Sequence, residues 1–346
     1  MVISFIHTSR KFSLKIKIKD IVQIRQIMNH SHETDDLDTA NNIMNKLSPP
    51  LKQSVTLHNG LKMPLLGFGT YRLKKESVED PVRYALSSGY RHIDTASVYR
   101  NEQFIGKIIN QNNDETKSVS NTNVQSKDIF ITTKLAPKDH GYEKASAAID
   151  ESIKNLGISP IDLFLVHWPG VSGKKPDDPE TPSMRLETWR ALEQALDEGK
   201  VRAIGVSNFT SRHLIHLLTN CRIKPHVNQI ELHPLCPQTE MIELCKTHQI
   251  QVVAYSSLGV GELLDHPVVL KVSNRKERTP AQILIRWAIQ KEICVIPKAS
   301  SRKRIEENSK VFEFELSKDD MLELDGISRE FPEAHHFCWN PESVLF

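Results

Sequence analysis

From Val55 onward, short apolar runs typical of β-strands alternate with longer segments whose apolar residues recur at helical spacing. The run Ile161–Val166 is apolar at every position except Asp162, which indicates a strand of a parallel sheet covered on both faces. The pattern predicts eight strands, at Leu65–Gly69, Arg91–Asp94, Ile129–Lys134, Ile161–His167, Ala203–Ser207, Val227–Glu231, Val252–Ser256 and Cys294–Pro297. Helices are predicted at Ser77–Ser87, Glu102–Asn110, Tyr142–Leu156, Met184–Glu198, Arg212–Thr219, Glu240–His248 and Pro280–Gln290.

Eight parallel strands with intervening helices fit either a closed (β/α)8 barrel or a doubly wound open sheet. An open sheet that binds a dinucleotide begins with a G-x-G-x-x-G turn that leads into a helix. Gly67 and Gly69 supply two of these glycines, but Arg72 occupies the third position and no helical pattern begins there. The strand count and the missing turn together predict an α/β fold of the TIM-barrel type.

Two further segments do not follow this alternation of strands and helices. Ser54–Leu57 and Leu61–Met63 enclose His58-Asn59-Gly60, and because Asn-Gly is a strong turn signal, an N-terminal β-hairpin is predicted. The segment Gln111–Lys127 is rich in Asn, Ser and Thr and has no periodicity, so we expect a flexible loop. This loop follows a helix and precedes a strand, which places it on the N-terminal face of the barrel, away from the expected site.

Residues 1–50 are expected to be a disordered extension before a barrel domain that spans residues 51–346. The segment Arg10–Arg25 is basic with a single acid, as in a mitochondrial transit peptide, although part of it alternates apolar and basic residues like a strand. His30–Ser48 is polar and rich in Asn and Asp, which is typical of a disordered linker. A transit peptide, a dispensable tail and a true start at Met28 remain the alternatives.

The composition narrows the class of function. A formal net charge of +2 gives no electrostatic reason to expect nucleic acid as a partner. No apolar run approaches the roughly 20 residues that cross a bilayer. The five cysteines form no C-x-x-C pair, so neither a disulfide framework nor a metal site is indicated. We expect a cytoplasmic monomer that acts on a small molecule, with a mitochondrial location as the alternative.

Polar residues end most of the predicted strands, and in a barrel these ends converge on one mouth. Asp94, Lys134 and His167 end the second, third and fourth strands, and Tyr99 follows Asp94 by five residues. Taken singly, a histidine after a strand is more often structural, and a lysine at a strand end is usually solvated. Their succession on neighbouring strands favours a site. Later strands contribute Ser207, Asn208, Gln229, Tyr255 and Lys298.

The first four of these residues have a use in protonating an alkoxide. An unperturbed tyrosine, with a pKa near 10, is a poor proton donor at neutral pH. We expect the Lys134 ammonium to lower the pKa of Tyr99, and Asp94 to keep Lys134 charged and oriented. His167 can form a hydrogen bond with the substrate oxygen. Because no side chain supplies a hydride, the reduction of a carbonyl also needs a cofactor.

Positions on the later strands suit a nicotinamide cofactor. Tyr255 offers a face on which the ring could stack, and three neighbouring polar residues could hold its carboxamide. The stretch Ile296–Ser301 precedes a predicted helix start with cations and hydroxyls, which suits a phosphate group. By itself this stretch slightly favours a capped and solvated helix start. The three carboxamide candidates are Ser207, Asn208 and Gln229.

From about Ser54 to its C-terminus, the chain resembles the aldo-keto reductase superfamily. The stretches that carry the resemblance are Gly67-Phe68-Gly69-Thr70-Tyr71, His92-Ile93-Asp94-Thr95-Ala96 with Tyr99 and Asn101-Glu102, Thr132-Thr133-Lys134-Leu135, Leu156-Gly157 with Asp162-Leu163, His167-Trp168-Pro169, Gly205-Val206-Ser207-Asn208-Phe209, Asn228-Gln229-Ile230-Glu231 with His233-Pro234, Ala254-Tyr255-Ser256, and Ile296-Pro297-Lys298 through Asn308.

The resemblance implies a (β/α)8 barrel without a Rossmann domain, which binds NADP(H) in an extended form and reduces aldehydes or ketones. It implies Tyr99 as general acid, completed by Asp94, Lys134 and His167. Lys298 with Arg304 favours NADPH over NADH. The cofactor-binding residues that it implies are Gly69, Thr70, Tyr71, Asp94, Ser207, Asn208, Gln229, Tyr255, Ser256, Leu258, Pro297, Lys298, Ser300, Ser301, Arg304, Glu307 and Asn308.

The chain departs from the family pattern in three ways. Ala299 stands where many members carry Ser, which puts one hydroxyl contact to the phosphate in doubt. The loop Ser257–His266 is short, so we expect an open cofactor cleft and fast cofactor exchange. The histidine at position 167 argues against the steroid double-bond reductases, which carry Glu there.

Specificity is expected from two loops that would close over the mouth, Val171–Arg185 and Phe331–Phe346. The residues expected to contact the substrate are Tyr99, His167, Trp168 and Trp339. The alternative function is a redox-sensing regulatory subunit that binds the cofactor with little turnover, like the channel-associated subunits of the superfamily. The short loop after Tyr255 argues against this alternative.

Overall fold

In the computed structural model, which describes residues 53–111, 124–330 and 334–346, eight strands lie side by side in the order of the sequence. Every neighbouring pair is parallel. The strands are β3 (Phe68–Gly69), β4 (His92–Asp94), β5 (Phe130–Leu135), β6 (Leu163–Val166), β7 (Ile204–Ser207), β8 (Val227–Glu231), β9 (Gln251–Tyr255) and β10 (Cys294–Val295).

The last strand meets the first, which closes the barrel. Leu66 and Val295 form a parallel bridge. The Gly67 N–H donates to the Val295 carbonyl at 2.8 Å, and the Val295 N–H donates to the Leu65 carbonyl at 2.8 Å. The predicted (β/α)8 barrel is therefore confirmed.

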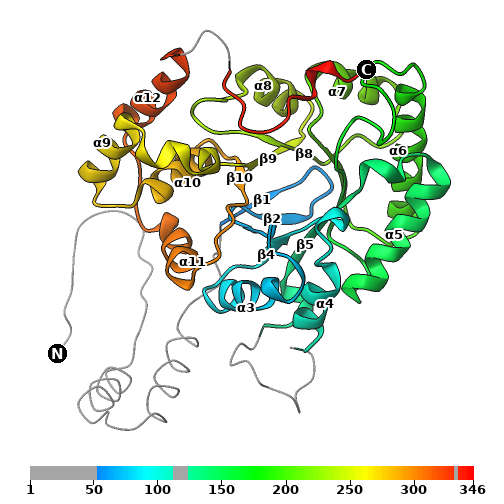
Figure 1. Cartoon of the computed structure of the whole chain (residues 1–346), viewed down its shortest axis with the longest axis horizontal. Coiled ribbons are helices and arrows are strands. Elements are labelled where there is room, and N and C mark those ends of the chain that lie inside the picture. Colours follow the sequence, from blue (N-terminus) through cyan, green and yellow to red (C-terminus); the bar gives the residue numbers. More distant parts are fainter. Residues whose placement is uncertain (1–52, 112–123, 331–333) are drawn as a thin grey trace. The chain divides into compact units, whose positions relative to one another are not determined.

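Helices surround the strands in Figure 1, and each of the predicted helices has a counterpart among them. For α5 and α10 both the first and the last residue agree with the prediction, because the sequence carries signals for helix ends. Gly157 caps the end of α5 in a left-handed conformation, and Thr279 with Pro280 starts α10. The helices are α3 (Glu79–Ser87), α4 (Glu102–Gln111), α5 (Tyr142–Leu156), α6 (Thr181–Asp197), α7 (Ser211–Asn220), α8 (Thr239–Thr247) and α10 (Pro280–Gln290).

Three further helices were not delimited from the sequence: α9 (Pro267–Lys276), α11 (Arg302–Ser309) and α12 (Lys318–Gly326). Their starts nevertheless carry capping signals, because Pro267 follows a capping His266 and Ser317 forms a capping box with Asp320. Short 3-10 helices occur at Lys75–Val78, Ser97–Tyr99, Ser126–Asp128, Pro137–Asp139, Gly259–Asp265, Lys310–Phe312, Ile327–Glu330 and Pro341–Ser343.

The predicted hairpin is present as β1 (Ser54–Thr56) and β2 (Lys62–Pro64), which pair in antiparallel fashion. It lies at the N-terminal end of the barrel. The Asn59 amide donates to the Arg202 carbonyl at 2.9 Å, and the His58 ring stacks on the His226 ring with their centroids 4.1 Å apart. Since Arg202 and His226 precede β7 and β8, the hairpin covers this end and leaves the C-terminal ends of the strands for a site.

Apolar side chains fill the space between strands and helices, with Trp189 of α6 and Trp287 of α10 among the largest buried ones. None of the helices in the described residues combines the length and the apolar character that crossing a membrane requires. The expected disordered extension and most of the expected loop Gln111–Lys127 lie outside the described residues.

Candidate active site

Three polar side chains from different strands meet inside the barrel mouth. Asp94 ends β4, Lys134 lies near the end of β5, and Gln229 lies on β8. The Lys134 ammonium donates to Asp94 Oδ1 at 2.5 Å and to the Thr95 carbonyl at 2.8 Å. The Gln229 amide donates to Asp94 Oδ2 at 2.8 Å. Both oxygens of the Asp94 carboxylate are therefore occupied, each by a different donor.

The Lys134–Asp94 pair is enclosed, with exposed fractions of 1% and 2%. Burial lowers the pKa of Lys134, and the adjacent Asp94 carboxylate acts against that shift. An ammonium group carries three N–H donors, and Asp94 and Thr95 use two of them. One donor of Lys134 remains, and the Tyr99 ring lies nearby, its centroid 5.3 Å from Lys134 Nζ.

Tyr99 is held in the loop that follows β4 by aromatic contacts. Its ring centroid lies 5.3 Å from that of Tyr71 and 5.8 Å from that of His167. Its hydroxyl forms no hydrogen bond within the described part of the chain, so it is available to a bound molecule.

The expectation that Lys134 lowers the pKa of Tyr99 is wrong for this structure. Burial raises the pKa of the Tyr99 hydroxyl well above its usual value, and the Asp94 carboxylate adds to the effect. The main physical reason is the burial of the Tyr99 hydroxyl, and in addition Asp94 lies directly on the Lys134 ammonium and offsets its charge. Tyr99 therefore stays protonated at neutral pH, which is the state that a proton donor needs.

His167 follows β6 and faces Tyr99. Burial, with a contribution from the Lys134 charge, lowers the pKa of His167 to about 3, so the imidazole is neutral at physiological pH. Its Nδ1 atom is buried without a partner among the described residues. A proton on Nδ1 would leave a buried N–H unpaired, so the tautomer with its proton on Nε2 is favoured. In that tautomer His167 can donate a hydrogen bond to an oxygen atom in the mouth.

The residues predicted to hold a carboxamide lie together at the end of β7 and on β8, next to Tyr255 of β9. The Ser207 hydroxyl donates to the Gln229 carbonyl at 2.9 Å, and the Asn208 amide donates to Ser207 Oγ at 3.1 Å. The Tyr255 hydroxyl donates to Asn208 Oδ1 at 2.6 Å. The Gln229 Oε1 atom has no partner within the described residues and remains available as an acceptor.

The predicted phosphate site lies where α11 begins. Arg302 pairs with Asp80 at 2.6 Å, and Lys303 lies 3.8 Å from Glu307. In the part of the chain that the structure describes, Lys298 and Arg304 have no acidic partner. The cations selected from the sequence are thus the ones left free for an anion. The other predicted residues of this segment are Pro297, Ser300, Ser301, which caps α11, and the buried Asn308.

The beginning of the barrel approaches this segment closely. A Cβ atom on Gly69 would lie 2.5 Å from the Ile296 carbonyl oxygen, so only glycine fits there. The Thr70 hydroxyl donates to the Asp94 carbonyl at 2.9 Å. Ser256 and Leu258, also predicted to bind the cofactor, follow β9, and Ser256 adopts a left-handed conformation with a φ of 50°.

The two loops expected to determine specificity contact each other. The Leu345 N–H donates to the Pro176 carbonyl at 2.8 Å, and Arg185 donates to the Leu345 carbonyl at 3.0 Å. Trp168 and Trp339 stack with their centroids 5.4 Å apart and their planes at 14°. The aromatic wall predicted from the sequence is therefore formed by one residue from each side of the mouth.

Sequence reasoning assigned no role to two buried polar residues of the site. Asn101 accepts from the Thr95 hydroxyl at 2.5 Å and donates to the Leu73 carbonyl at 2.8 Å, which fixes the loops after β3 and β4. Glu231 binds the C-terminal segment. Its place directly at the end of a predicted strand was the available signal. Within the described residues, no group of three His, Cys, Asp or Glu side chains could hold a metal ion.

A closed parallel barrel with a Lys–Asp pair, a tyrosine and a neutral histidine at its mouth has the equipment of an oxidoreductase. The model of the Aldo/keto reductase family matches residues 65–329. The chain is 41% identical over 280 residues to the 9,11-endoperoxide prostaglandin H2 reductase of Trypanosoma cruzi, covering 80% of this chain and 92% of that protein. It is 38% identical over 297 residues to the glyoxal reductase of Bacillus subtilis, covering 86% and 99%.

A solved structure of a Gox0644 mutant in complex with NADPH has a TM-score of 0.74 to this chain at 33% identity, covering 85% of this chain and 99% of that one. This chain belongs to the aldo-keto reductase family, whose members are oxidoreductases that act on carbonyl compounds.

Proposed function

We propose that the protein transfers a hydride from NADPH to the carbonyl of an aldehyde or ketone, with Tyr99 as the general acid. The observation that carries the proposal is the buried Lys134, which is bound by Asp94 and lies beside a protonated Tyr99 with one N–H donor left over. This is the arrangement needed to give a proton to a developing alkoxide.

When bound, NADPH supplies the hydride that adds to the carbonyl carbon. The negative charge that develops on the carbonyl oxygen takes the proton of the Tyr99 hydroxyl. The free N–H of Lys134 donates to the Tyr99 oxygen and stabilises the phenolate that is left. His167 donates from Nε2 to the same substrate oxygen and holds it near Tyr99. The roles of these three residues follow from the donors that each has available.

The residues present fit NADPH at both of its ends. Gln229 offers a free oxygen to a carboxamide, and the neighbouring Ser207 and Asn208 are fixed by hydrogen bonds. Lys298 and Arg304 are the unpaired cations that a 2′-phosphate requires, which favours NADPH over NADH. The similar structure solved with NADPH supports this choice. We assign further cofactor contacts to Gly69, Thr70, Tyr71, Asp94, Tyr255, Ser256, Leu258, Pro297, Ser300, Ser301, Glu307 and Asn308.

The substrate would enter between aromatic side chains. Tyr71 lies beside Tyr99, and Trp168 stacks on Trp339 at the rim. Such walls suit flat carbonyl compounds, and the similarity to the Bacillus glyoxal reductase supports a small dicarbonyl as a second substrate class. We therefore propose aromatic aldehydes and small dicarbonyls as the first compounds to test.

The direct experiment compares the full chain with its Tyr99→Phe variant. NADPH oxidation is followed with benzaldehyde and with glyoxal, and NADH serves as the parallel cofactor. We expect Tyr99→Phe to lower kcat by a factor of about 10² to 10⁴ while NADPH binding stays unchanged. Undiminished turnover in Tyr99→Phe contradicts the assignment. Tight NADPH binding without turnover of any carbonyl by the unmodified chain would favour the regulatory subunit instead.

A further inference from the structure

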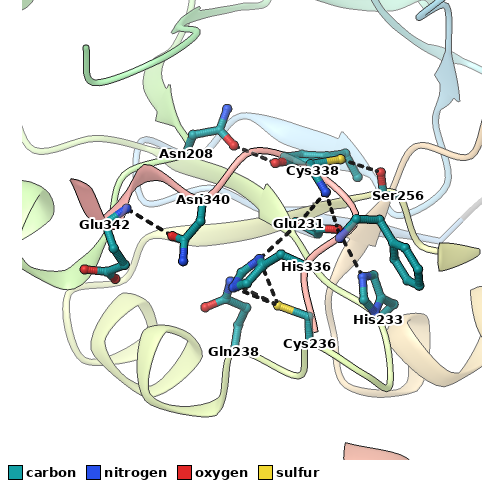
Figure 2. A network of polar contacts seen from close by, with 12 residues as sticks. Asn208, Glu231, His233, Cys236, Gln238, Ser256, His336, Cys338, Asn340 and Glu342 are labelled. Atoms are coloured by element: carbon teal, nitrogen blue, oxygen red, sulfur yellow. Dashed lines mark hydrogen bonds and ion pairs between the residues drawn. The ribbon is translucent and has the colours of Figure 1, made fainter. Parts of the chain in front are cut away.

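The C-terminal strap, residues 334–346, contacts the ends of β8 and β9, and several of its residues bind one buried carboxylate there (Figure 2). Glu231, at the end of β8, is 4% exposed. Its Oε1 atom accepts from the backbone N–H of Phe337 at 2.8 Å and of Cys338 at 3.2 Å. Its Oε2 atom lies 3.1 Å from the Nδ1 atom of His336. Three consecutive residues of the strap thus bind one side chain.

Glu231 has the charge state that this binding requires. Burial raises the pKa of the Glu231 carboxyl, but hydrogen bonds from His233, the Phe337 N–H and His336 outweigh burial, and the net pKa is lowered. An ionised buried carboxylate without donors is strongly unfavourable, and no Lys or Arg pairs with Glu231 in the described residues. The strap therefore supplies most of the donors that keep this charge in the barrel rim.

The contacts of Glu231 determine where the next strap residue lies. Trp339 directly follows Cys338, is 71% exposed, and is kept in place by stacking on Trp168. Beyond Trp339 the strap is fastened again, because the Val344 carbonyl lies 2.8 Å from His213 Nε2. The strap is therefore bound on both sides of Trp339, by Glu231 at Phe337 and Cys338 and by His213 at Val344, and the contacts with Glu231 lie closer to Trp339 in the sequence.

The space under the strap adjoins the candidate active site. A cavity of about 320 Å³ is lined by Asn208 and Tyr255 on the barrel side and by His336 and Trp339 on the strap side. A shift of the strap changes the size of this cavity and the stacking of Trp339 on Trp168. Within the described residues, Glu231 forms no hydrogen bond or ion pair with Asp94, Lys134 or Tyr99, and the Lys134–Asp94 pair is held by Thr95 and Gln229.

From these contacts we infer that Glu231 is a specificity-determining residue that acts through the strap and not on the substrate. It positions Trp339 as a wall for large carbonyl compounds, while small ones reach Tyr99 without meeting that wall. The inference rests on the proposed reductase function, which it deepens by naming the residue that selects substrates by size.

The test compares Glu231→Gln with Glu243→Gln, an exposed glutamate of α8, as the matched control. Glutamine keeps the shape of the side chain but turns one acceptor into a donor that faces N–H groups. Hydrogen–deuterium exchange of the strap and steady-state kinetics with NADPH are measured, using glyoxal and 4-phenylbenzaldehyde. We expect roughly tenfold faster exchange at the strap and a roughly tenfold higher KM for 4-phenylbenzaldehyde, with glyoxal changed by less than about twofold.

Two further variants identify the cause. Trp339→Ala should raise the same KM, and adding Glu231→Gln to it should change that KM no further, because both act through one wall. His336→Ala, which alters the strap and not the barrel, should also raise the KM for 4-phenylbenzaldehyde, but by less. If Glu231→Gln fails to fold, the result with His336→Ala tests the inference in its place.

The inference would be overturned if Glu231→Gln raised the KM equally for both aldehydes, or if hydrogen–deuterium exchange at the strap stayed unchanged. Exchange is measured without turnover, so a chain that reduces neither compound refutes the proposed function, while the exchange data still decide whether Glu231 anchors the strap.

Discussion

The Lys134 ammonium lies 2.5 Å from Asp94 Oδ1, and both side chains are enclosed at the ends of β4 and β5. Removing charges from water is costly, and the pair recovers this cost only through close geometry and further hydrogen bonds. Thr95 and Gln229 supply those bonds. Their arrangement leaves one lysine donor unused beside Tyr99, so the architecture of the pair bears on both stability and catalysis.

The first prediction concerns stability. Lys134→Met leaves the Asp94 carboxylate buried without its cation and should lower the free energy of unfolding by about 3 kcal/mol, measured by urea denaturation. Lys107→Met removes an exposed lysine that pairs with Glu79 at 3.2 Å, and it should cost less than about 1 kcal/mol. Equal losses in the two variants would show that burial of the pair has no energetic consequence.

A second prediction concerns Gln229, whose amide occupies Asp94 Oδ2. Without it, that oxygen is free to draw the remaining N–H of Lys134 away from Tyr99. Gln229→Met should therefore lower kcat by about tenfold. The matched control is Gln194→Met, because Gln194 also donates to a carboxylate, that of Glu198 at 2.9 Å, but on the exposed face of α6. A rise in the Kd for NADPH with unchanged kcat would instead limit Gln229 to cofactor binding.

Cofactor choice gives a third prediction. Lys298→Ala and Arg304→Ala should each raise the KM for NADPH by about tenfold or more, since each removes a charge-assisted bond to phosphate, and should leave the KM for NADH nearly unchanged. Arg302→Ala and Lys303→Ala are the controls, because these cations already face Asp80 and Glu307. If all four variants respond alike, the effect is one of net charge only.

A fourth prediction follows from buried histidines. Burial lowers the pKa of His92 and of His140 from 6.5 to about 4. Between these values the unfolded chain takes up protons that the folded chain does not, so the stability present above pH 6.5 is lost as the pH falls toward 4. Urea denaturation at a series of pH values should show a falling free energy of unfolding over this window. A constant or rising value would contradict the assignment of neutral, buried imidazoles.

The barrel and the meeting of Asp94 and Lys134 could be predicted because both follow from strand order. In a closed parallel barrel, every strand end faces the same mouth, so residues distant in sequence become neighbours without any knowledge of their side-chain geometry. The pKa of Tyr99 could not be predicted in this way. Its direction depends on how closely Asp94 covers the Lys134 charge and on how deeply the hydroxyl is buried, and neither is encoded in spacing.

The position of Glu231 at the end of a predicted strand was visible in the sequence, but its contacts with the C-terminal segment were not, for a similar reason. Its partners lie about a hundred residues downstream, in a segment without strong periodicity, and two of its bonds are to backbone N–H groups that any residue would offer. The helices α9 and α12 were a different kind of omission. Their capping signals were present, but α9 is a second helix between β9 and β10, and α12 follows the last strand, so a pattern of one helix after each strand predicts neither.

The account depends most directly on Lys134 acting through Tyr99. Single-turnover oxidation of NADPH with saturating aldehyde should be measured in the unmodified chain, in Tyr99→Phe, in Lys134→Met and in the double variant. If Lys134 acts by assisting proton donation from Tyr99, the double variant should be no slower than Tyr99→Phe, because removing the Tyr99 hydroxyl already abolishes the step that Lys134 assists. A double variant whose loss equals the product of the two single losses would contradict the account.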